Sequence, residues 1–455
     1  MPFLDAQLDA VEQAMPFGVR GRVQAVTGLT LEASDLPLPL GSLCRIETLT
    51  GHRAAEVIGI RADRTLLMPL ESPAGIARGD VVSNVAAAPR IWCSDALLGR
   101  VINGFGDPID GLGAIRADES RRLDGRSPRP LDRLPIRQPI TTSLRAIDAL
   151  HTCGLGQRMG IFSGPGVGKS TLMSAIAKHT SADVSVVALI GERGREVQEF
   201  IENRLGPEGM ARCCIIFSTG DEAPLLRVRA AKAACAVAEY FRDRGLHVML
   251  MMDSLTRLCQ AQRQIGLAAG EPPATKGFPP SVFAMIPELL ERAGNTPVGS
   301  ITGFYTVLVE GDDFNEPIPD AVKGITDGHF WLNRKLADRG HFPALDVTQS
   351  ISRVRGDVTD KEHQRQARRV LSLWAVYKDI EDLVNIGAYA AGANPEYDLA
   401  VQARPRIQAF LRQEGGDPRT MEQSRQELAE LSVWLDQMDK VVRAQKAAPP
   451  ARGQR

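Results

Sequence analysis

The chain lacks the features that would tie it to a membrane or to a nucleic acid. No apolar run approaches the roughly 18 residues of a membrane span, and the N-terminus lacks the basic start and long apolar stretch of a secretory leader. The 54 basic and 55 acidic side chains nearly cancel, so we expect no nucleic-acid partner and no strong attraction to an anionic membrane. The seven cysteines include no C-x-x-C pair, which favours reduced thiols and a cytoplasmic protein.

The remaining composition is typical of a globular protein with several domains: 455 residues, 44% of them hydrophobic and 24% charged. Short β-branched runs broken by Gly, Pro and Asp predict a small antiparallel barrel near the N-terminus. Apolar strand candidates then alternate with helical stretches, which predicts a parallel sheet covered by helices on both faces. These strand candidates lie at residues 184–190, 213–219, 247–253 and 300–311. The pattern divides the chain into an amphipathic helix at 1–18, a β-barrel domain at 19–90, an α/β domain at 91–355, a helical domain at 356–442 and a disordered tail at 443–455.

A glycine-rich turn, "FSGPGVGKST" at residues 162–171, lies between an apolar strand candidate and a stretch with helical periodicity. Glycine lets successive backbone N–H groups point at one place, and the start of a helix there suits a phosphate. The turn resembles the Walker A loop, G-x-x-x-x-G-K-[ST], with Ser163 at its first glycine position. An ordinary strand-to-helix turn is the alternative, but the Gly-Lys-Ser-Thr run favours ATP binding. The residues expected to contact ATP in this loop are Ser163, Gly164, Pro165, Gly166, Val167, Gly168, Lys169, Ser170 and Thr171.

Two acidic residues follow strand candidates, where ligands of a parallel sheet bind. Asp253 closes "VMLMMD" in the manner of a Walker B strand, so it could hold Mg²⁺ beside the Ser170 hydroxyl. Glu192 follows "VVALIG" and could polarise the water that attacks the γ-phosphate, with Arg193 neutralising phosphate charge. The alternatives are that Asp253 caps a helix and that "ERGRE" is a surface cluster of ion pairs.

Longer segments resemble one family over most of the chain. "GERGREVQEFIEN", "MDSLTRLCQAQRQIGLAAGEPPATKGFPPSVFAMIPELLERAG", "GSITGFYTVLVEGDD" and "HFPALDVTQSISR" are similar to the ATPases of flagellar and type III protein export, which are relatives of the catalytic subunits of rotary ATP synthases. The resemblance implies a P-loop (RecA-like) α/β core between an N-terminal β-barrel and a C-terminal helical domain. It also implies an ATPase that hydrolyses ATP with Mg²⁺.

The resemblance assigns roles within the expected site. Lys169 and Glu192 become catalytic, and Arg193 and Glu196 become supporting charges, with Glu196 beside the metal. Phe342 falls where the family places an aromatic ring against the adenine. A second aromatic that the synthase subunits place against the base is absent, since "EGGDP" follows "RIQAFLRQ" here. The specificity for the base therefore stays open.

The resemblance also implies partners. Arg353, in "SISRV", matches an arginine finger that enters the site of a neighbouring subunit, so a chain that holds both halves of the site should form a homo-oligomer, by analogy a hexamer. The N-terminal helix would bind a regulator of the export apparatus, and "EPPATKGFPPSVF", with Lys276 and Phe278, would face a shaft-like subunit or a passing polypeptide. The export gate, secretion substrates and chaperones complete the expected partners. The protein would then be cytoplasmic and at most peripheral to the inner membrane, at the base of the export apparatus.

Three functions compete at this stage. The first is an export ATPase that unfolds or releases substrates and chaperones, with the flagellar branch favoured over the injectisome branch. The second is a rotary ATP synthase subunit, which the presence of both site halves in one chain disfavours. The third is an RNA translocase, which would need aromatic platforms and a basic groove in the barrel. Residues 19–91 contain no Phe, Tyr or Trp, and residues 20–90 contain eight Arg, no Lys and seven acids.

Overall fold

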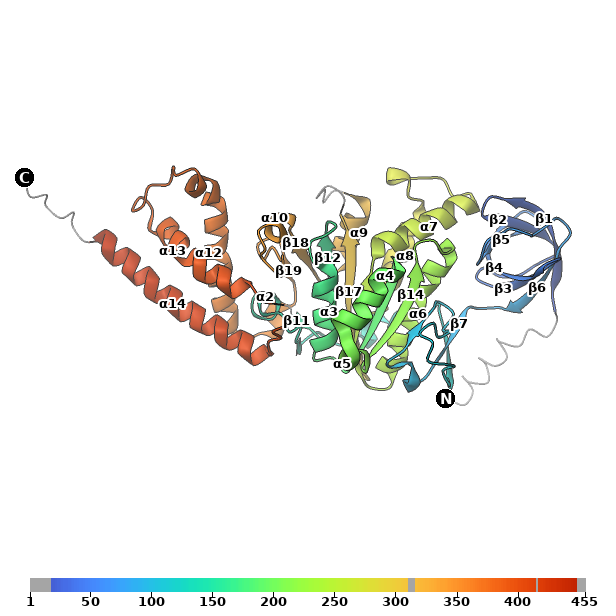
Figure 1. Cartoon of the computed structure of the whole chain (residues 1–455), viewed down its shortest axis with the longest axis horizontal. Helices are drawn as coiled ribbons and strands as arrows, with labels where there is room; N and C mark the ends of the chain where they lie inside the picture. The colour runs from blue at the N-terminus through green and yellow to red at the C-terminus, as the bar shows by residue number, and fades with distance from the viewer. Residues whose placement is uncertain (1–17, 310–315, 415, 448–455) are drawn as a thin grey trace, which may run out of the picture.

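Three units follow one another along the long axis of the molecule (Figure 1). The computed structural model describes residues 18–309, 316–414 and 416–447. A small barrel forms one end, a sheet flanked by helices forms the middle, and three long helices form the other end. The predicted N-terminal helix lies outside the described residues, which begin at Gly18.

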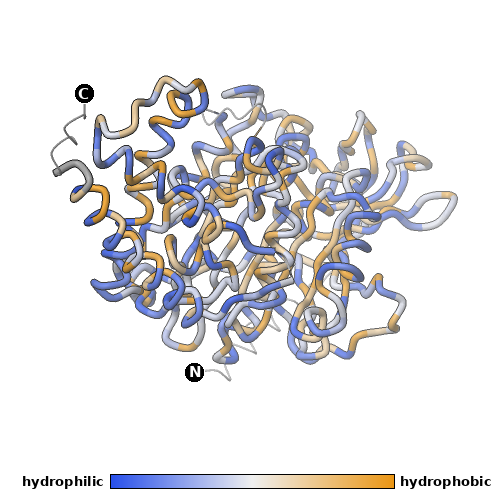
Figure 2. The backbone as a smooth tube through the Cα atoms, turned by 60° about the vertical axis from the view of Figure 1, so that its left-hand side comes forward, coloured by the Kyte–Doolittle hydropathy of each residue, from blue (hydrophilic) through white to orange (hydrophobic). Residues whose placement is uncertain are grey.

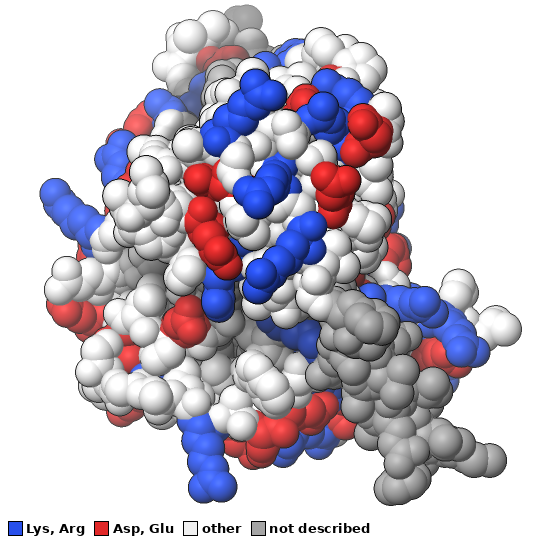
Figure 3. Space-filling view, turned by 90° about the vertical axis from the view of Figure 1, so that its right-hand side faces the viewer, with Lys and Arg blue, Asp and Glu red and all other residues white. Residues whose placement is uncertain are grey.

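The N-terminal unit is a closed barrel with the strand order β1-β2-β5-β4-β3-β6. Its antiparallel strands are β1 (Arg20–Thr27), β2 (Thr30–Ser34), β3 (Leu43–Thr48), β4 (Gly51–Arg61), β5 (Arg64–Pro69) and β6 (Val81–Ala86). Apolar side chains at alternate positions, such as Val23, Ile46 and Val82, are fully buried inside it, as expected for strands with one face in a core. The barrel predicted from the sequence is confirmed. On the face that Figure 3 shows, basic and acidic side chains are interspersed.

The central unit is built on a nine-stranded sheet whose main path is β19-β18-β12-β17-β15-β13-β14-β8. Neighbours from β18 to β8 are parallel, whereas β19 pairs antiparallel with β18 and β16 antiparallel with β17. The strands are β8 (Val101–Ile102), β12 (Arg158–Ser163), β13 (Val184–Glu192), β14 (Cys213–Thr219), β15 (His247–Asp253), β16 (Gly294–Asn295), β17 (Ser300–Leu308), β18 (Gly328–Leu332) and β19 (Ile351–Ser352). Two small sheets pair β7 (Arg90–Cys93) with β9 (Glu119–Arg122) and β10 (Pro139–Ile140) with β11 (Cys153–Gly154).

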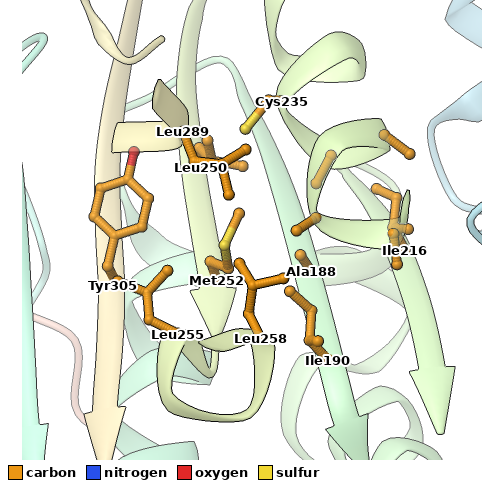
Figure 4. Close-up of a cluster of buried hydrophobic side chains, with 14 of the residues drawn as sticks. Ala188, Ile190, Ile216, Cys235, Leu250, Met252, Leu255, Leu258, Leu289 and Tyr305 are labelled. Carbon is orange, nitrogen blue, oxygen red and sulfur yellow. The ribbon is translucent and has the colours of Figure 1, made fainter. Parts of the chain in front are cut away.

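Helices cover both faces of this sheet, as the sequence predicts. Along β13, Ala188 and Ile190 join one core and Val187 and Leu189 join the other, because successive side chains of a strand point to opposite faces. Figure 4 shows the first core, and Figure 2 shows that hydrophobic segments run through the interior. The helices are α2 (Arg145–Leu150), α3 (Lys169–His179), α4 (Gly194–Glu199), the π-helix η3 (Phe200–Leu205), α5 (Gly206–Met210), α6 (Pro224–Asp243), α7 (Leu255–Ala269), α8 (Pro280–Leu290), α9 (Pro317–Ile325), α10 (Arg334–Asp338) and α11 (Arg355–Val358), with 3-10 turns η1 (Asp95–Leu97), η2 (Pro130–Asp132) and η4 (Thr275–Gly277).

The C-terminal unit consists of α12 (Lys361–Asn385), α13 (Pro395–Leu411) and α14 (Met421–Ala447). Residues 443–447 belong to α14, so the predicted start of a disordered tail at residue 443 was wrong. No helix within the described ranges combines the length and the apolar character that crossing a membrane requires.

A buried ion pair joins helix α6 to the segment that follows α8. Arg292 donates through Nε and Nη2 to the two carboxylate oxygens of Glu239, each at 2.7 Å, and through Nη1 to the carbonyl of Leu123 at 2.7 Å. Arg292 is 3% exposed and Glu239 is 7% exposed. Because two charges are held away from water, each depends on the other for compensation.

Replacing Glu239 with Ala should lower the free energy of unfolding by about 3–5 kcal/mol, because it leaves a buried guanidinium without its counter-charge. Urea unfolding followed by circular dichroism measures the loss. The double variant Glu239→Leu, Arg292→Met removes both charges and should lose less than the single variant. Wild-type stability in Glu239→Ala would show that the pair is not needed.

Candidate active site

The glycine-rich loop connects the end of β12 at Ser163 to the start of α3 at Lys169. Gly166 and Gly168 have φ values of +77° and +88°, a region that side chains rarely adopt. The hydroxyl of Ser163 is buried and has no hydrogen-bond partner within the described structure. The loop therefore presents backbone N–H groups at the N-terminus of an eleven-residue helix, which is a favourable place for phosphate.

Two buried carboxylates flank the side chain of Lys169. Its Nζ lies 2.5 Å from Oδ1 of Asp253 and 3.8 Å from Oε1 of Glu192. Asp253 is 3% exposed and Glu192 is 6% exposed. The two acids meet because β13 and β15 are adjacent parallel strands, with Leu189 paired with Asp253. Thr306 donates to Oδ1 of Asp253 at 2.7 Å, which fixes the carboxylate from the β17 side.

The environment of Glu192 raises its pKa, which favours a role as a proton acceptor. Burial, the hydrogen bond with Glu196 and the charge of Asp253 raise the pKa of Glu192 to about 7, against the opposing effect of Lys169 and Arg257. A carboxylate with a pKa close to the working pH can take a proton from water and release it again. This is the property that a catalytic glutamate needs.

Arg257 belongs to the same cluster and was missed in the sequence analysis. Its Nη1 lies 3.2 Å from Oε2 of Glu192 and donates to the carbonyl of Gly191. Helix α7 begins just after Asp253, and the Ser254 hydroxyl accepts from the backbone N–H of Arg257 at 3.4 Å. The spacing in "DSLTR" could have predicted this contact. Arg257 follows Asp253 by four residues, about one helical turn, so its side chain lies near the end of the strand again.

Arg193 and Glu196 lie outside this cluster. Their side chains are 84% and 50% exposed and form an ion pair with each other at 3.9 Å. Glu196 still reaches the cluster through its hydrogen bond with Glu192. The roles of Arg193 in catalysis and of Glu196 beside a metal remain predictions.

The residues fit a hard divalent cation that is held mainly by phosphate and water. Ser170 is the second residue of α3, and the carboxylate of Asp253 lies against Lys169 at the start of that helix. Oxygen ligands of this kind suit Mg²⁺, which usually takes few ligands from the protein. Within the described ranges, no group of three or more His, Cys, Asp or Glu side chains is arranged to hold a metal by itself.

A cavity of about 1040 Å³ extends from the loop toward the C-terminal helices. Gly168 and Thr171 line it on one side, and residues at the end of α13, including Arg412, line the other. Phe342 also lines the cavity and is 46% exposed. A Cβ on Gly168 would lie 3.4 Å from its ring, so the ring is next to the phosphate loop, and its contact with adenine remains a prediction.

Arg353 lies far from the loop within the chain. It follows β19, in which Ser352 pairs with Gly328 at the start of β18. Leu332, at the other end of β18, pairs with Ser163 where the loop begins. Gly328 and Leu332 are four residues apart on β18, and at ~3.3 Å per residue this separates Ser352 from Ser163 by on the order of 13 Å along the strand direction. The exposed Arg353 side chain therefore lies at the edge of the sheet opposite the edge where the loop of its own chain begins.

Comparison with known proteins gives consistent matches. The model of the ATP synthase alpha/beta family, nucleotide-binding domain, matches residues 143–352, and that of the T3SS EscN ATPase C-terminal domain matches residues 359–430. The chain is 48% identical to the flagellum-specific ATP synthase of Pseudomonas aeruginosa, covering 94% of this chain and 96% of the relative. It is 45% identical to the type 3 secretion system ATPase of Xanthomonas euvesicatoria, covering 90% and 94%. The chain belongs to the family of flagellar and type III secretion ATPases.

Solved structures of this family share the whole fold. The assembled ATPase EscN of the enteropathogenic E. coli type III secretion system superposes with a TM-score of 0.86 at 44% identity, covering 90% of this chain and 100% of that one. EscN in complex with its central stalk EscO gives a TM-score of 0.84. The predicted P-loop α/β core, N-terminal barrel and C-terminal helical domain are thereby confirmed.

Replacing Glu192 with Gln should lower the rate of ATP hydrolysis by ~10²-fold or more while ATP binding persists, because the amide keeps the shape but cannot accept a proton. A phosphate-release assay measures turnover, and a fluorescent ATP analogue measures binding. Glu202→Gln, an exposed acid on the neighbouring η3 segment, serves as the matched control. If Glu192→Gln hydrolysed ATP at the wild-type rate, Glu192 would have no role in catalysis and would only form ion pairs.

Proposed function

We propose that this chain is the ATP-hydrolysing motor of a type III protein export apparatus, in its flagellar branch. The observation that carries the proposal is the buried cluster of Lys169, Asp253 and Glu192 behind the phosphate loop. It lies in a chain that aligns over nearly its full length with flagellum-specific ATP synthases. The export ATPase of an injectisome is the alternative, since identities to flagellar relatives of 47–50% overlap those to type 3 secretion relatives of 43–48%.

In this proposal the side chains of the cluster divide the work of phosphoryl transfer. Lys169 leaves Asp253 for the β- and γ-phosphates of ATP, which compete for its ammonium. Asp253 and Ser170 would then hold Mg²⁺, which when bound neutralises phosphate charge. Glu192 accepts a proton from the attacking water, and Arg257 holds its carboxylate in place.

We further infer a ring of identical subunits, with Arg353 of one subunit completing the site of the next. Its position near the start of β18, whereas its own phosphate loop begins beside the end of that strand, supports action on a neighbour. The family resemblance also supports a shaft-like subunit, an export gate, substrates and chaperones as partners, and a regulator bound to the N-terminal segment. We place the ring in the cytoplasm, peripheral to the inner membrane.

The function is tested by complementation. Expressed in a Pseudomonas aeruginosa strain without its flagellum-specific ATP synthase, the chain should restore swimming, because a motor of the same branch can use the resident apparatus. Lys169→Ala should restore none, since the compact charge for the phosphates is lost, whereas Lys178→Ala at the far end of α3 should restore swimming. Rescue of type III secretion without rescue of swimming would assign the injectisome branch.

The shared site is tested by mixing two inactive proteins. Arg353→Ala and Lys169→Ala should each lose ~10³-fold or more in the rate of hydrolysis, the scale of an arginine finger. Mixed together, they form interfaces that pair an intact loop with an intact finger, so part of the activity should return as subunits exchange. The measured rate should fall again on dilution. If gel filtration shows that mixed rings have formed but the mixture stays inactive, Arg353 does not complete the site of the neighbouring subunit.

A further inference from the structure

The cavity beside the phosphate loop has an aromatic wall on one side only. Phe342 is the single aromatic side chain among the described residues that line it. On the side of α13 the cavity is lined by Pro405, Gln408 and Ala409 of the helix and by Arg412, Gln413 and Glu414, which follow it. A flat base that contacts Phe342 thus meets no second aromatic ring among the described lining residues, and the guanidinium of Arg412 is a planar group on the α13 side.

The backbone around Arg412 is held firmly against the Phe342 segment. The N–H of Gln413 donates to the carbonyl of Phe342 at 2.9 Å. The N–H of Arg412 donates to the carbonyl of Gln408 at 3.1 Å, and its carbonyl accepts from Nη2 of Arg145 at 2.5 Å. Arg412 therefore starts from a fixed position on the wall of the cavity.

The side chain of Arg412 is oriented as well. Its Nε donates to Nδ1 of His341 at 3.3 Å. His341 is 2% exposed, and burial together with the charges of Arg412 and Lys378 lowers its pKa to about 4. The ring is consequently neutral and able to accept this hydrogen bond at physiological pH.

Two further polar side chains that line the cavity, those of Gln413 and Arg145, are engaged with the protein itself. The Gln413 amide donates to the carbonyls of Ser143 at 2.8 Å and Asp417 at 2.7 Å, and its oxygen accepts from the N–H of Arg145 at 2.7 Å. The Arg145 guanidinium donates to the carbonyls of Phe410 at 2.6 Å and Ala409 at 3.1 Å. It also forms an ion pair with Glu427. The side chain of Gln413 therefore has no donor left to read the edge of a base, and Arg145 has four of its five N–H groups engaged.

We propose that the planar guanidinium of Arg412 stacks on the face of the base opposite Phe342, and that the site accepts purine nucleoside triphosphates with little discrimination between them. The inference rests on the proposed function, because it needs a triphosphate held at Lys169. Guanidinium groups stack on flat rings, which a lysine ammonium cannot imitate. Stacking tolerates different bases because every base has a π-face, whereas strong discrimination requires hydrogen bonds to the base edge.

Steady-state kinetics of ATP hydrolysis tests the stack. Arg412→Ala should raise KM for ATP roughly tenfold and leave kcat within about twofold, since the contact is lost equally in the ground state and the transition state. Arg412→Lys should show the same rise, and Arg412→Tyr should return KM toward the wild-type value. Arg406→Ala serves as matched control, because this exposed arginine on α13 packs over Trp434 outside the cavity.

Inorganic tripolyphosphate separates the base from the phosphates. As a competitive inhibitor without a base, it should bind the wild type and Arg412→Ala equally. A KM for ATP in Arg412→Ala at the wild-type level would overturn the stack, and so would an equal loss of tripolyphosphate affinity. Failure of the proposed function has a different signature: wild type and Lys169→Ala would then have the same rates.

A comparison of ATP with GTP as substrates tests whether the site discriminates between purine bases. The wild type should hydrolyse both with kcat/KM values within tenfold of each other, and Arg412→Ala should raise both KM values by the same factor. A wild-type preference for ATP larger than tenfold would show that the base edge is read and would overturn the tolerance.

Discussion

One ammonium group between two buried carboxylates is the interaction on which the central unit depends. Asp253 and Glu192 are both nearly inaccessible to water, and buried like charges repel strongly in a medium of low permittivity. Lys169 offsets one negative charge and Arg257 reduces the effect of the other. An incoming triphosphate would compete with Asp253 for the same ammonium, and the carboxylate that the ammonium leaves would need another cation, such as Mg²⁺, to compensate its charge.

The sheet makes this arrangement possible. Adjacent parallel strands end at the same edge, so a residue at the end of β13 and one at the end of β15 meet although they are far apart in the sequence. The helix that follows β12 brings Lys169 to the same edge. Burial of alternate side chains on both faces holds the strands in register, since a slip by one residue would exchange the two faces. Packing in the two cores thus sets the positions of the charges.

The pattern of apolar residues along the sequence predicted several strands of the central sheet well, but it did not predict which side chains contact one another. The strands at 213–219 and 247–253 match the observed β14 and β15 residue for residue, because long apolar runs between turn residues leave little freedom. The loop and Asp253 were predicted from contiguous motifs and Glu192 from the family resemblance, and the structure places the side chains of Lys169, Asp253 and Glu192 together. Arg257 was missed because its role depends on how α7 leaves the strand. The contacts of Arg145 with α13 and Glu427 join residues more than 260 positions apart, which no local pattern encodes.

Those distant contacts give the C-terminal helices a direct connection to the site. Arg145 lies at the start of α2 in the central unit and holds the carbonyls at the end of α13 together with Glu427 of α14. The same end of α13 carries Arg412 and Gln413, which are tied to the Phe342 segment. A base that enters between these walls would contact both units at once. Arg145 thus ties α2 to both α13 and α14, in addition to the direct packing of α13 on α14, so the position of α13 at the cavity is coupled to the rest of the C-terminal unit.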